Sequence, residues 1–366
     1  MPIYMDVHIV PGVKARNVAE AHRKDLLHQE EFGCNCMTYW IDEERESIFC
    51  LIDAPNKAAV EEMHNKAHGL VPNKIIEVSS SVVESFLGRI YDPEEAEITE
   101  QGLKVFRDPS YRILLVTNIN DTVLLQYKYG AEEVKAILKK HNEVIRRNIT
   151  QYKGREVEHA GNGFIISFNS AGNAVSAALA IQNEIPASDA EMIGFRISIN
   201  AGEPIQKSND LFGDTIKTAQ QMCAIAKYFQ VALASSVKEL IAKDLYEDNG
   251  QRFLTLPPQD EALLKKIYNV LEEHWQDPDF DVEEYCKAIA MSKSQLYRKI
   301  IALTGYSPNL LIKEYRLEKA KELMKKKYYN ISQVTFDSGF TSPSYFTKCF
   351  KQKFGMLPMT YVDLLQ

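Results

Sequence analysis

The sequence lacks the marks of a secreted or membrane-spanning protein. Its six cysteines are scattered and form neither a CxxC pair nor the disulfide framework typical of small secreted domains. No apolar stretch approaches the roughly 18 residues that a membrane span requires. The first residues carry no basic segment, and Asp6 and His8 interrupt the apolar run, so no signal peptide is expected. These absences predict a cytoplasmic protein without a membrane partner.

The composition is that of a globular protein with more than one domain. The 366 residues are 45% hydrophobic and 25% charged, and this length predicts two or three domains. Two segments have the composition of linkers: residues 84–111, with charged Asp-Pro steps, and residues 242–260, with an Asp-Asn-Gly turn and paired prolines. We therefore expect domains at residues 1–83, 112–241 and 261–366.

Basic residues are concentrated toward the C-terminus. The whole chain has a net charge of −7, but from Glu261 onward 16 basic residues stand against 13 acidic ones. From Tyr285 onward the numbers are 14 and 5, a net charge of +9. Because phosphate binding requires local positive charge, this is the part of the chain that is suited to nucleic acid.

The last hundred residues contain one pattern twice, with an offset of fifty. Each copy begins with a serine suited to cap a helix, Ser292 or Ser342, continues with apolar residues four and eight positions later, and ends with a glycine. A shorter helical run and a tight turn precede each copy, at Val282–Ala290 and Ile331–Asp337. The repeat predicts two helix-turn-helix units. A connecting helix over about Asn309–Lys327, roughly 28 Å long, could place the two capped helices about one DNA turn apart.

The exposed faces of the two capped helices carry hydrogen-bond donors and positive charge. Gln and Arg can make paired hydrogen bonds to base edges, and Lys mainly contacts phosphates, so we predict that both helices bind double-stranded DNA. The predicted contact residues are Lys293, Ser294, Gln295, Tyr297, Arg298 and Lys299 on the first helix, and Ser344, Tyr345, Thr347, Lys348 and Lys351 on the second, which also carries Lys353.

This C-terminal part resembles the DNA-binding domain of AraC-family transcription regulators over about 105 residues. The segments that carry the resemblance are Thr304-Gly305-Tyr306-Ser307-Pro308, Arg316-Leu317-Glu318, Gly339-Phe340-Thr341-Ser342 and Phe354-Gly355-Met356. Thr335 departs from the family, which usually has alanine in this tight helix contact. The resemblance implies an all-α double helix-turn-helix domain and sequence-specific regulation of transcription, with RNA polymerase as a further candidate partner.

Strands and helices alternate in the middle of the chain. The expected strands are Arg112–Ile119, Phe164–Phe168, Phe195–Ala201 and Val231–Ala234; the expected helices are Ala131–Asn148, Ala171–Asn183 and Asp214–Tyr228, with a hairpin turn at Gly161-Asn162-Gly163. This layout, together with Gly154–Gly163, Arg196–Gly202 and Phe212–Ile216, resembles the class III nucleotide cyclase domain over about 130 residues. The resemblance implies an α/β fold that pairs face to face in a homodimer.

The cyclase resemblance also implies that catalytic groups are missing. Active cyclases hold two divalent ions with two aspartates, and the corresponding residues here are Asn118 and Asn162. An amide binds Mg²⁺ poorly and adds no charge, so we expect a protein that is not an enzyme. The later asparagine and arginine of the family fall at Lys217 and Gln221. Glu158 stands where guanylate-type cyclases read the purine, so it is either a nucleotide-binding residue or an ordinary strand residue.

The first 80 residues alternate as β-α-β-β-α-β, typical of a ferredoxin-like fold. Strands are expected at Ile3–Val10, Cys36–Asp42, Ser47–Ile52 and Lys74–Val78, and helices at Asn17–Glu31 and Lys57–Ala67. Five of the eight histidines lie within the first 68 residues. His64 and His68 are four positions apart, so they share a helical face and could bind one ion. Asp6 and His8 share one face of the first strand.

This N-terminal part resembles a small family of nickel-binding ferredoxin-like proteins. The resemblance is carried by Asp6-Val7-His8, Ala21-His22-Arg23, Tyr39-Trp40, Phe49-Cys50-Leu51 and His64-x3-His68-Gly69. It implies His8, His22, His64 and His68 as metal ligands; the alternative is that they are surface or capping histidines. Imidazole suits Ni²⁺, Cu²⁺ and Zn²⁺ alike, so the metal stays open. The cysteines and the remaining histidines, His141 among them, are interpreted as ordinary.

These observations predict an AraC-type regulator controlled by a metal or small ligand bound in the other two domains. The ligand would favour one arrangement of the dimer and so change DNA binding. Two alternatives belong to other classes: a cyclase fused to a DNA-binding domain, and a metal-buffering protein with a helical tail. Production of cyclic nucleotide would favour the first, and metal uptake without salt-sensitive DNA binding the second.

Overall fold

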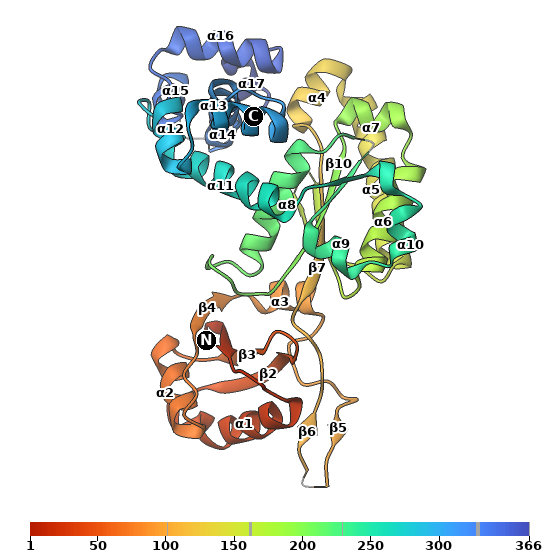
Figure 1. The fold of residues 1–366 in the computed structure, drawn as a ribbon, viewed down its shortest axis with the longest axis vertical. Coiled ribbons are helices and arrows are strands. Elements are labelled where there is room, and N and C mark those ends of the chain that lie inside the picture. Colours follow the sequence, from red (N-terminus) through yellow and green to blue (C-terminus); the bar gives the residue numbers. More distant parts are fainter. Residues whose placement is uncertain (101, 161–162, 229, 327–329, 366) are drawn as a thin grey trace.

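The computed structural model describes residues 1–100, 102–160, 163–228, 230–326 and 330–365. Figure 1 shows three units that follow one another in the chain: an N-terminal α/β unit, a middle unit built on a larger sheet, and a C-terminal group of helices. This is the predicted multidomain architecture, with ferredoxin-like, cyclase-like and all-α parts.

The N-terminal unit has the predicted β-α-β-β-α-β order. Its elements are β1 (Ile3–Ile9), α1 (Ala15–His28), the 3-10 helix η1 (Gln29–Phe32), β2 (Asn35–Asp42), β3 (Ser47–Asp53), α2 (Lys57–Ala67) and β4 (Lys74–Val78). The four strands form an antiparallel sheet in the order β2-β3-β1-β4. Strand β1 therefore lies inside the sheet, with a neighbour on each side.

The two faces of this sheet pack against different partners. Alternate residues of a strand point to opposite faces. On one face Tyr4 belongs to a core with Val18 of α1 and Val60 of α2. On the other face Met5 and Val7 belong to a separate core. That second core also contains helix α3 (Ser80–Leu87) and Leu114, Leu211 and Phe212 of the middle unit.

Polar contacts reinforce this junction between the N-terminal and middle units. Lys74 Nζ donates to the backbone carbonyls of Lys207 and Ser208, at 2.8 and 2.5 Å. Ser47 Oγ donates to Glu203 at 2.7 Å. Buried Arg112 donates to carbonyl oxygens of α3, and burial lowers the pKa of this guanidinium to about 10. The N-terminal unit is therefore fixed to the middle unit by both apolar and polar contacts.

The segment between these units contains a short element of regular structure. After α3 it forms a short two-stranded hairpin of β5 (Glu97–Ile98) and β6 (Lys104–Val105). The hairpin lies beside helix α1 in Figure 1, and Leu103, Val105 and Phe106 are part of that unit's core. In the segment 84–111, expected as a linker, the hairpin thus packs with the N-terminal unit, whereas the end of α3 also contacts the middle unit.

The middle unit is a six-stranded sheet with helices on its faces. Its elements are β7 (Arg112–Asn118), α4 (Thr122–Tyr129), α5 (Ala131–Gln151), β8 (Arg155–Ala160), β9 (Gly163–Phe168), α6 (Ala171–Glu184), α7 (Ala187–Ile193), β10 (Arg196–Gly202), α8 (Gly213–Ile225), β11 (Val231–Leu233), α9 (Ser235–Leu240), α10 (Lys243–Glu247), η2 (Gly250–Arg252) and β12 (Phe253–Thr255). The strand order is β12-β11-β10-β7-β9-β8. Strand β12 pairs with β11, so part of the expected linker at residues 242–260 is the edge of this sheet. The expected turn residues Gly161 and Asn162 lie outside the described residues.

The C-terminal unit consists of helices that reproduce the predicted repeat. They are α11 (Pro258–His274), α12 (Val282–Ile289), α13 (Lys293–Thr304), α14 (Pro308–Lys325), α15 (Ile331–Asp337), α16 (Pro343–Phe354) and α17 (Pro358–Asp363). Ser292 and Ser342 accept backbone hydrogen bonds from the third residue of α13 and α16, so both predicted caps are confirmed. Each helix ends at a glycine with left-handed φ, +75° at Gly305 and +77° at Gly355.

Both halves of the C-terminal unit contact the middle unit. One apolar core runs from the six-stranded sheet through α11 into α12, α13 and α14. The second half meets helix α4, whose Val123 and Leu124 pack against the core of α14 to α17. At the first turn of α4, buried Asp121 accepts a hydrogen bond from Tyr361 at 2.9 Å and lies 3.0 Å from Lys325 Nζ. We refer to this arrangement as the Asp121 contact.

Replacing Asp121 by asparagine is expected to destabilise the protein by about 1.5–3 kcal/mol, because asparagine keeps the helix cap but loses the charge. Burial alone would raise the pKa of Asp121, but Lys321, Lys325 and Tyr361 hold it below its ordinary value. A depressed pKa gives stability that is complete above the unfolded-state pKa and lost as pH falls through the folded-state pKa. Urea unfolding of both proteins should therefore show a constant difference from neutral pH to about pH 4.5. Below about pH 3.9 the difference should shrink. A difference that persists at low pH would contradict this account.

Candidate metal centre and DNA-binding surface

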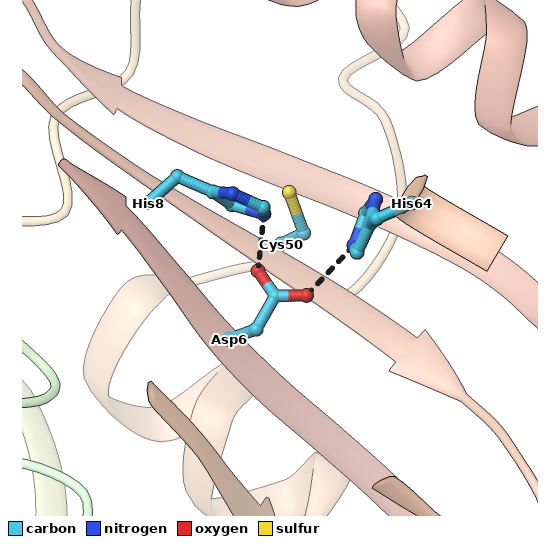
Figure 2. A group of neighbouring side chains, drawn as sticks. All are labelled: Asp6, His8, Cys50 and His64. Carbon is cyan, nitrogen blue, oxygen red and sulfur yellow. Dashed lines mark hydrogen bonds and ion pairs between the residues drawn. The ribbon is translucent and has the colours of Figure 1, made fainter. Parts of the chain in front are cut away.

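Strand β1 and helix α2 bring two histidines to one buried carboxylate. Asp6 Oδ2 lies 2.9 Å from His64 Nε2, and Asp6 Oδ1 lies 3.3 Å from His8 Nε2. Figure 2 shows the Asp6 carboxylate between the two imidazole rings, with the Cys50 sulfur beside them. One possible ligand atom from each of these four residues lies within 4.8 Å of the others, and all four residues are buried. The strand alternation places Asp6 and His8 on this face, and α2 covers it.

A second carboxylate and a third histidine extend this group. Asp25 of α1 lies 3.2 Å from His64 Nδ1 and 3.1 Å from His68 Nε2. His68 follows the last turn of α2, and its Nε2 is 3.1 Å from His64 Nδ1. His64 is therefore the central member of a cluster of Asp6, His8, Asp25, His64 and His68, which we call the histidine–aspartate cluster.

The electrostatics of the cluster are those of buried charges that compensate one another. Burial alone would lower the pKa of His64, but the Asp6 and Asp25 carboxylates raise it to about 10. Burial would raise the pKa of both carboxyl groups, yet their histidine neighbours lower it. Burial also raises the pKa of the Cys50 thiol. Two carboxylates and a protonated imidazole thus share one site, where a cation could replace the proton.

The donor set and the available space fit a small transition-metal ion. Asp6 Oδ1 is buried and has no hydrogen bond of good geometry among the described residues, although His8 is close. A cavity of about 20 Å³ adjoins the cluster, bordered by His8, His22, Asp25, Cys50 and His68. Such a volume holds about one water molecule. Imidazole nitrogen suits Ni²⁺, Cu²⁺ and Zn²⁺, so the cluster could hold such an ion through His8, His64 and His68 with carboxylate oxygens.

The structure brings three of the four predicted histidines together. His8, His64 and His68 have ring centroids 4.9 to 6.3 Å apart. His22 borders the same cavity, but its Nε2 faces Asp92 at 3.8 Å, and burial lowers its pKa. Sequence reasoning missed Asp25. The signal was its position three residues after His22, which places both on one face of α1.

Most of the predicted DNA-contact residues of α13 are exposed. Lys293, Ser294, Gln295 and Arg298 are exposed, while Tyr297 and Lys299 are half-buried. Four of these side chains already have partners in the protein. Ser294 Oγ lies 3.3 Å from Ser292 Oγ, and Tyr297 accepts a hydrogen bond from Asn309 at 3.4 Å. Gln295 accepts a hydrogen bond from the Ser292 backbone in a capping box, and Lys299 lies 2.8 Å from Asp260. Arg298 is therefore the better-placed residue for a base contact on this helix.

Helix α16 presents a second basic surface. Ser344, Tyr345, Lys348 and Lys351 are exposed and Thr347 is half-buried. Lys353 instead lies 2.7 Å from Glu314 and 2.8 Å from Glu318 of α14, so it connects two helices within the unit.

Thr335 occupies the tight helix contact without an unsatisfied hydroxyl. It is fully buried, and its Oγ1 donates to the carbonyl of Ile331 at 2.8 Å. An intrahelical bond of this kind accommodates the extra oxygen where the AraC family usually has alanine.

The residues at the cyclase positions lie on separate elements. Asn118 is exposed at the end of β7, and Glu158 is exposed on β8. Lys217 and Gln221 lie on α8, and buried Gln221 has no hydrogen-bond partner for its side chain among the described residues. Asn162 lies outside the described residues. Of the two positions where active cyclases have a metal-binding aspartate, the first is therefore an exposed asparagine, Asn118, and the second lies outside the described residues.

Comparisons with known families assign each unit to a class. Residues 4–78 match nickel responsive proteins of the SCO4226-like type, residues 113–256 match the adenylate and guanylate cyclase catalytic domain, and residues 285–363 match a helix-turn-helix domain. The N-terminal unit is thus a nickel-responsive-like domain, and the middle unit is cyclase-like. The C-terminal unit is a helix-turn-helix domain, and its type is that of the AraC family.

Individual relatives cover only parts of the chain. A histidine kinase P4 of Formosa agariphila is 39% identical over 108 residues, which is 30% of this chain and 8% of that protein. A putative adenylate cyclase 3 of Rhizobium meliloti is 28% identical over 29% of this chain and 19% of its own length. The solved structure of SCO4226 from Streptomyces coelicolor A3(2) is 29% identical, covers 21% of this chain and 94% of its own, and has a TM-score of 0.20. This chain therefore spans less than a fifth of either curated relative. Among the described residues, no helix is long and apolar enough to cross a bilayer.

Proposed function

We propose that this protein is an AraC-type transcription regulator whose binding to double-stranded DNA is controlled by a divalent transition metal. The observation that carries the proposal is the histidine–aspartate cluster, in which three imidazoles and two carboxylates meet in a buried site. The AraC-type unit supplies the DNA-binding surface, with Arg298 and Lys348 as principal contacts. Nickel is the first candidate because of the N-terminal family match, and Cu²⁺ and Zn²⁺ suit the same ligands.

A path for the signal runs from the cluster to the DNA-binding unit. Asp6 and His8 of β1 belong to the cluster, while Met5 and Val7 of the same strand pack in the core shared with Leu114 of β7. Four residues after Leu114, β7 ends, and the chain leads directly into the Asp121 contact. A shift of β1 on metal binding would therefore change how the C-terminal helices contact the middle unit at Asp121. Metal binding would thus shift the population between two arrangements of these units.

The cyclase-like unit serves in this proposal as a connecting and pairing unit rather than as an enzyme. Asparagines at the two metal positions would not hold the ions that activate the ribose hydroxyl. Pairing of two chains through this unit would join two DNA-binding units and raise their combined affinity. The competing enzyme hypothesis requires cyclic nucleotide to form from ATP or GTP.

The proposal is tested by DNA affinity with and without metal. DNA fragments selected from a random pool by the purified protein would be titrated by fluorescence anisotropy with Ni²⁺, Cu²⁺, Zn²⁺ or a chelator. Because coupling between two sites typically amounts to 1–3 kcal/mol, we expect one of the metals to change the dissociation constant by about 5- to 150-fold. Mg²⁺, which prefers oxygen ligands, is the matched control and should have no effect. Equal affinity in all conditions would overturn metal control, and metal uptake without DNA binding would favour the buffering alternative.

A further inference from the structure

A second cavity lies in the middle unit, between helix α5 and the strands β8 and β9. Its volume is about 170 Å³, and it is bordered by Ile119, Leu138, His141, Asn142, His159, Gly163 and Phe164. It belongs to a different unit from the histidine–aspartate cluster. It is also smaller than the roughly 300–1,000 Å³ of sites that hold drug-sized ligands, so a nucleotide is too large for it.

His141, which borders this cavity, carries a buried polar atom that lacks a partner among the described residues. The His141 side chain is 4% exposed, and its Nε2 has no hydrogen-bond partner among the described residues. Its Nδ1 lies 3.2 Å from Asn142 Oδ1, and its ring packs edge-on against Phe195. A buried ring nitrogen without a partner destabilises the protein, because it has lost its hydrogen bond to water, and a ligand with a suitable group would restore that bond.

The protonation of His141 decides which kind of group it can bind. Burial lowers its pKa to about 4, so the ring is neutral at physiological pH. A neutral imidazole has one N–H and one acceptor nitrogen. Because Nδ1–H donates to Asn142 Oδ1, Nε2 is the acceptor. The complementary ligand group is therefore an O–H or N–H donor.

The apolar residues that border the cavity favour an apolar ligand about the size of one aromatic ring. Ile119, Leu138 and Phe164 supply apolar surface, and Phe164 stacks on His159 with centroids 4.1 Å apart. A cavity of about 150 Å³ with apolar walls is large enough to bind benzene. We propose that this cavity binds a small, uncharged aromatic molecule that donates one hydrogen bond to His141 Nε2. This site goes beyond the proposed metal control and does not depend on it.

The position of the cavity would allow a bound ligand to influence the DNA-binding unit through helix α4. Ile119 borders the cavity and stands two residues before Asp121, which holds Tyr361 and Lys325 of the C-terminal unit. Helix α4 joins the two places, since it starts at the Asp121 contact and packs against α5.

The test uses ¹⁹F NMR titration of the full-length protein with 4-fluorophenol and with fluorobenzene, which has the same ring but no donor. We expect 4-fluorophenol to bind more tightly. His141→Leu should lower the affinity for 4-fluorophenol by about three- to tenfold, because one hydrogen bond is lost. The affinity for fluorobenzene should be nearly unchanged. Leu138→Phe should fill the cavity and abolish the binding of both probes. This variant still tests the proposal if His141→Leu does not fold.

His28→Leu in helix α1 makes the same side-chain change far along the chain, on another unit, and should leave both affinities unaltered. The proposal is overturned if neither probe binds the wild-type protein, which would mean that the cavity holds only water. It is equally overturned if His141→Leu affects both probes alike, or if binding persists in Leu138→Phe.

Discussion

Replacing His64 by alanine is expected to remove metal binding and to destabilise the metal-free protein by about 3–5 kcal/mol, since two buried carboxylates lose their shared cation. His64 is fully buried and lies 2.9 Å from Asp6 and 3.2 Å from Asp25. In the wild-type protein, metal at about 100 to 1,000 times its dissociation constant should stabilise by roughly 2.7–4.1 kcal/mol. Denaturant unfolding with and without Ni²⁺ measures both effects.

His28 provides the matched control for this substitution. It lies at the end of α1 in the same unit and faces Glu31 rather than the cluster. His28→Ala should change the free energy of unfolding by less than about 0.5 kcal/mol and keep the metal effect, as expected for a surface position. If His64→Ala kept the full stabilisation by metal, the ion would bind elsewhere and the histidine–aspartate cluster would not be the metal site.

The double variant Arg298→Ala/Lys348→Ala is expected to lose about 2–5 kcal/mol of DNA-binding free energy. Each residue comes from a different exposed helix face, α13 or α16, so the two losses should be nearly additive. A base contact by Arg298 is worth about 1–3 kcal/mol and sets sequence preference. A phosphate contact by Lys348 should lower affinity for all sequences and reduce the salt dependence by about one charge.

Fluorescence anisotropy with selected and unrelated DNA at several salt concentrations separates these two effects. Arg23→Ala/Lys135→Ala removes the same side-chain types from exposed positions on α1 and α5 and should leave DNA binding intact. Unchanged affinity and sequence preference in Arg298→Ala/Lys348→Ala would show that α13 and α16 are not the recognition helices.

The sequence could predict most of the fold because its strongest signals are local. Ser292 and Ser342, with the glycines that follow, mark the helix ends of the repeat, and caps act within one turn. The strands of the N-terminal unit were predictable for a similar reason, since alternation along β1 is visible in the sequence. Among the elements that escaped prediction are the two-residue strands β5 and β6 and the three-residue edge strand β12, which are short and are defined by their pairing with another strand.

The candidate site was predictable only in part. His64 and His68 are one helical turn apart, so their meeting could be predicted, and His8 followed from the family resemblance. Asp25 lies 39 residues from His64 in the chain. Its position three residues after His22 predicts that the two share a face of α1, but the sequence does not show that this face meets His64 of α2. The Asp121 contact, between residues 240 positions apart, was hidden for the same reason. Buried acids that pair with histidines require the packed structure to be recognised.

The alternation of strand β1 has a consequence for how this protein can change in evolution. Asp6 and His8 face the cluster, and Met5 and Val7 between them face the middle unit. A single inserted or deleted residue in β1 would turn the apolar pair toward the cluster and the polar pair toward the apolar interface. In the proposed mechanism, metal binding and signal transmission therefore depend on one register of these four side chains in β1. Substitutions can adjust either function, but no length change within the strand can preserve both.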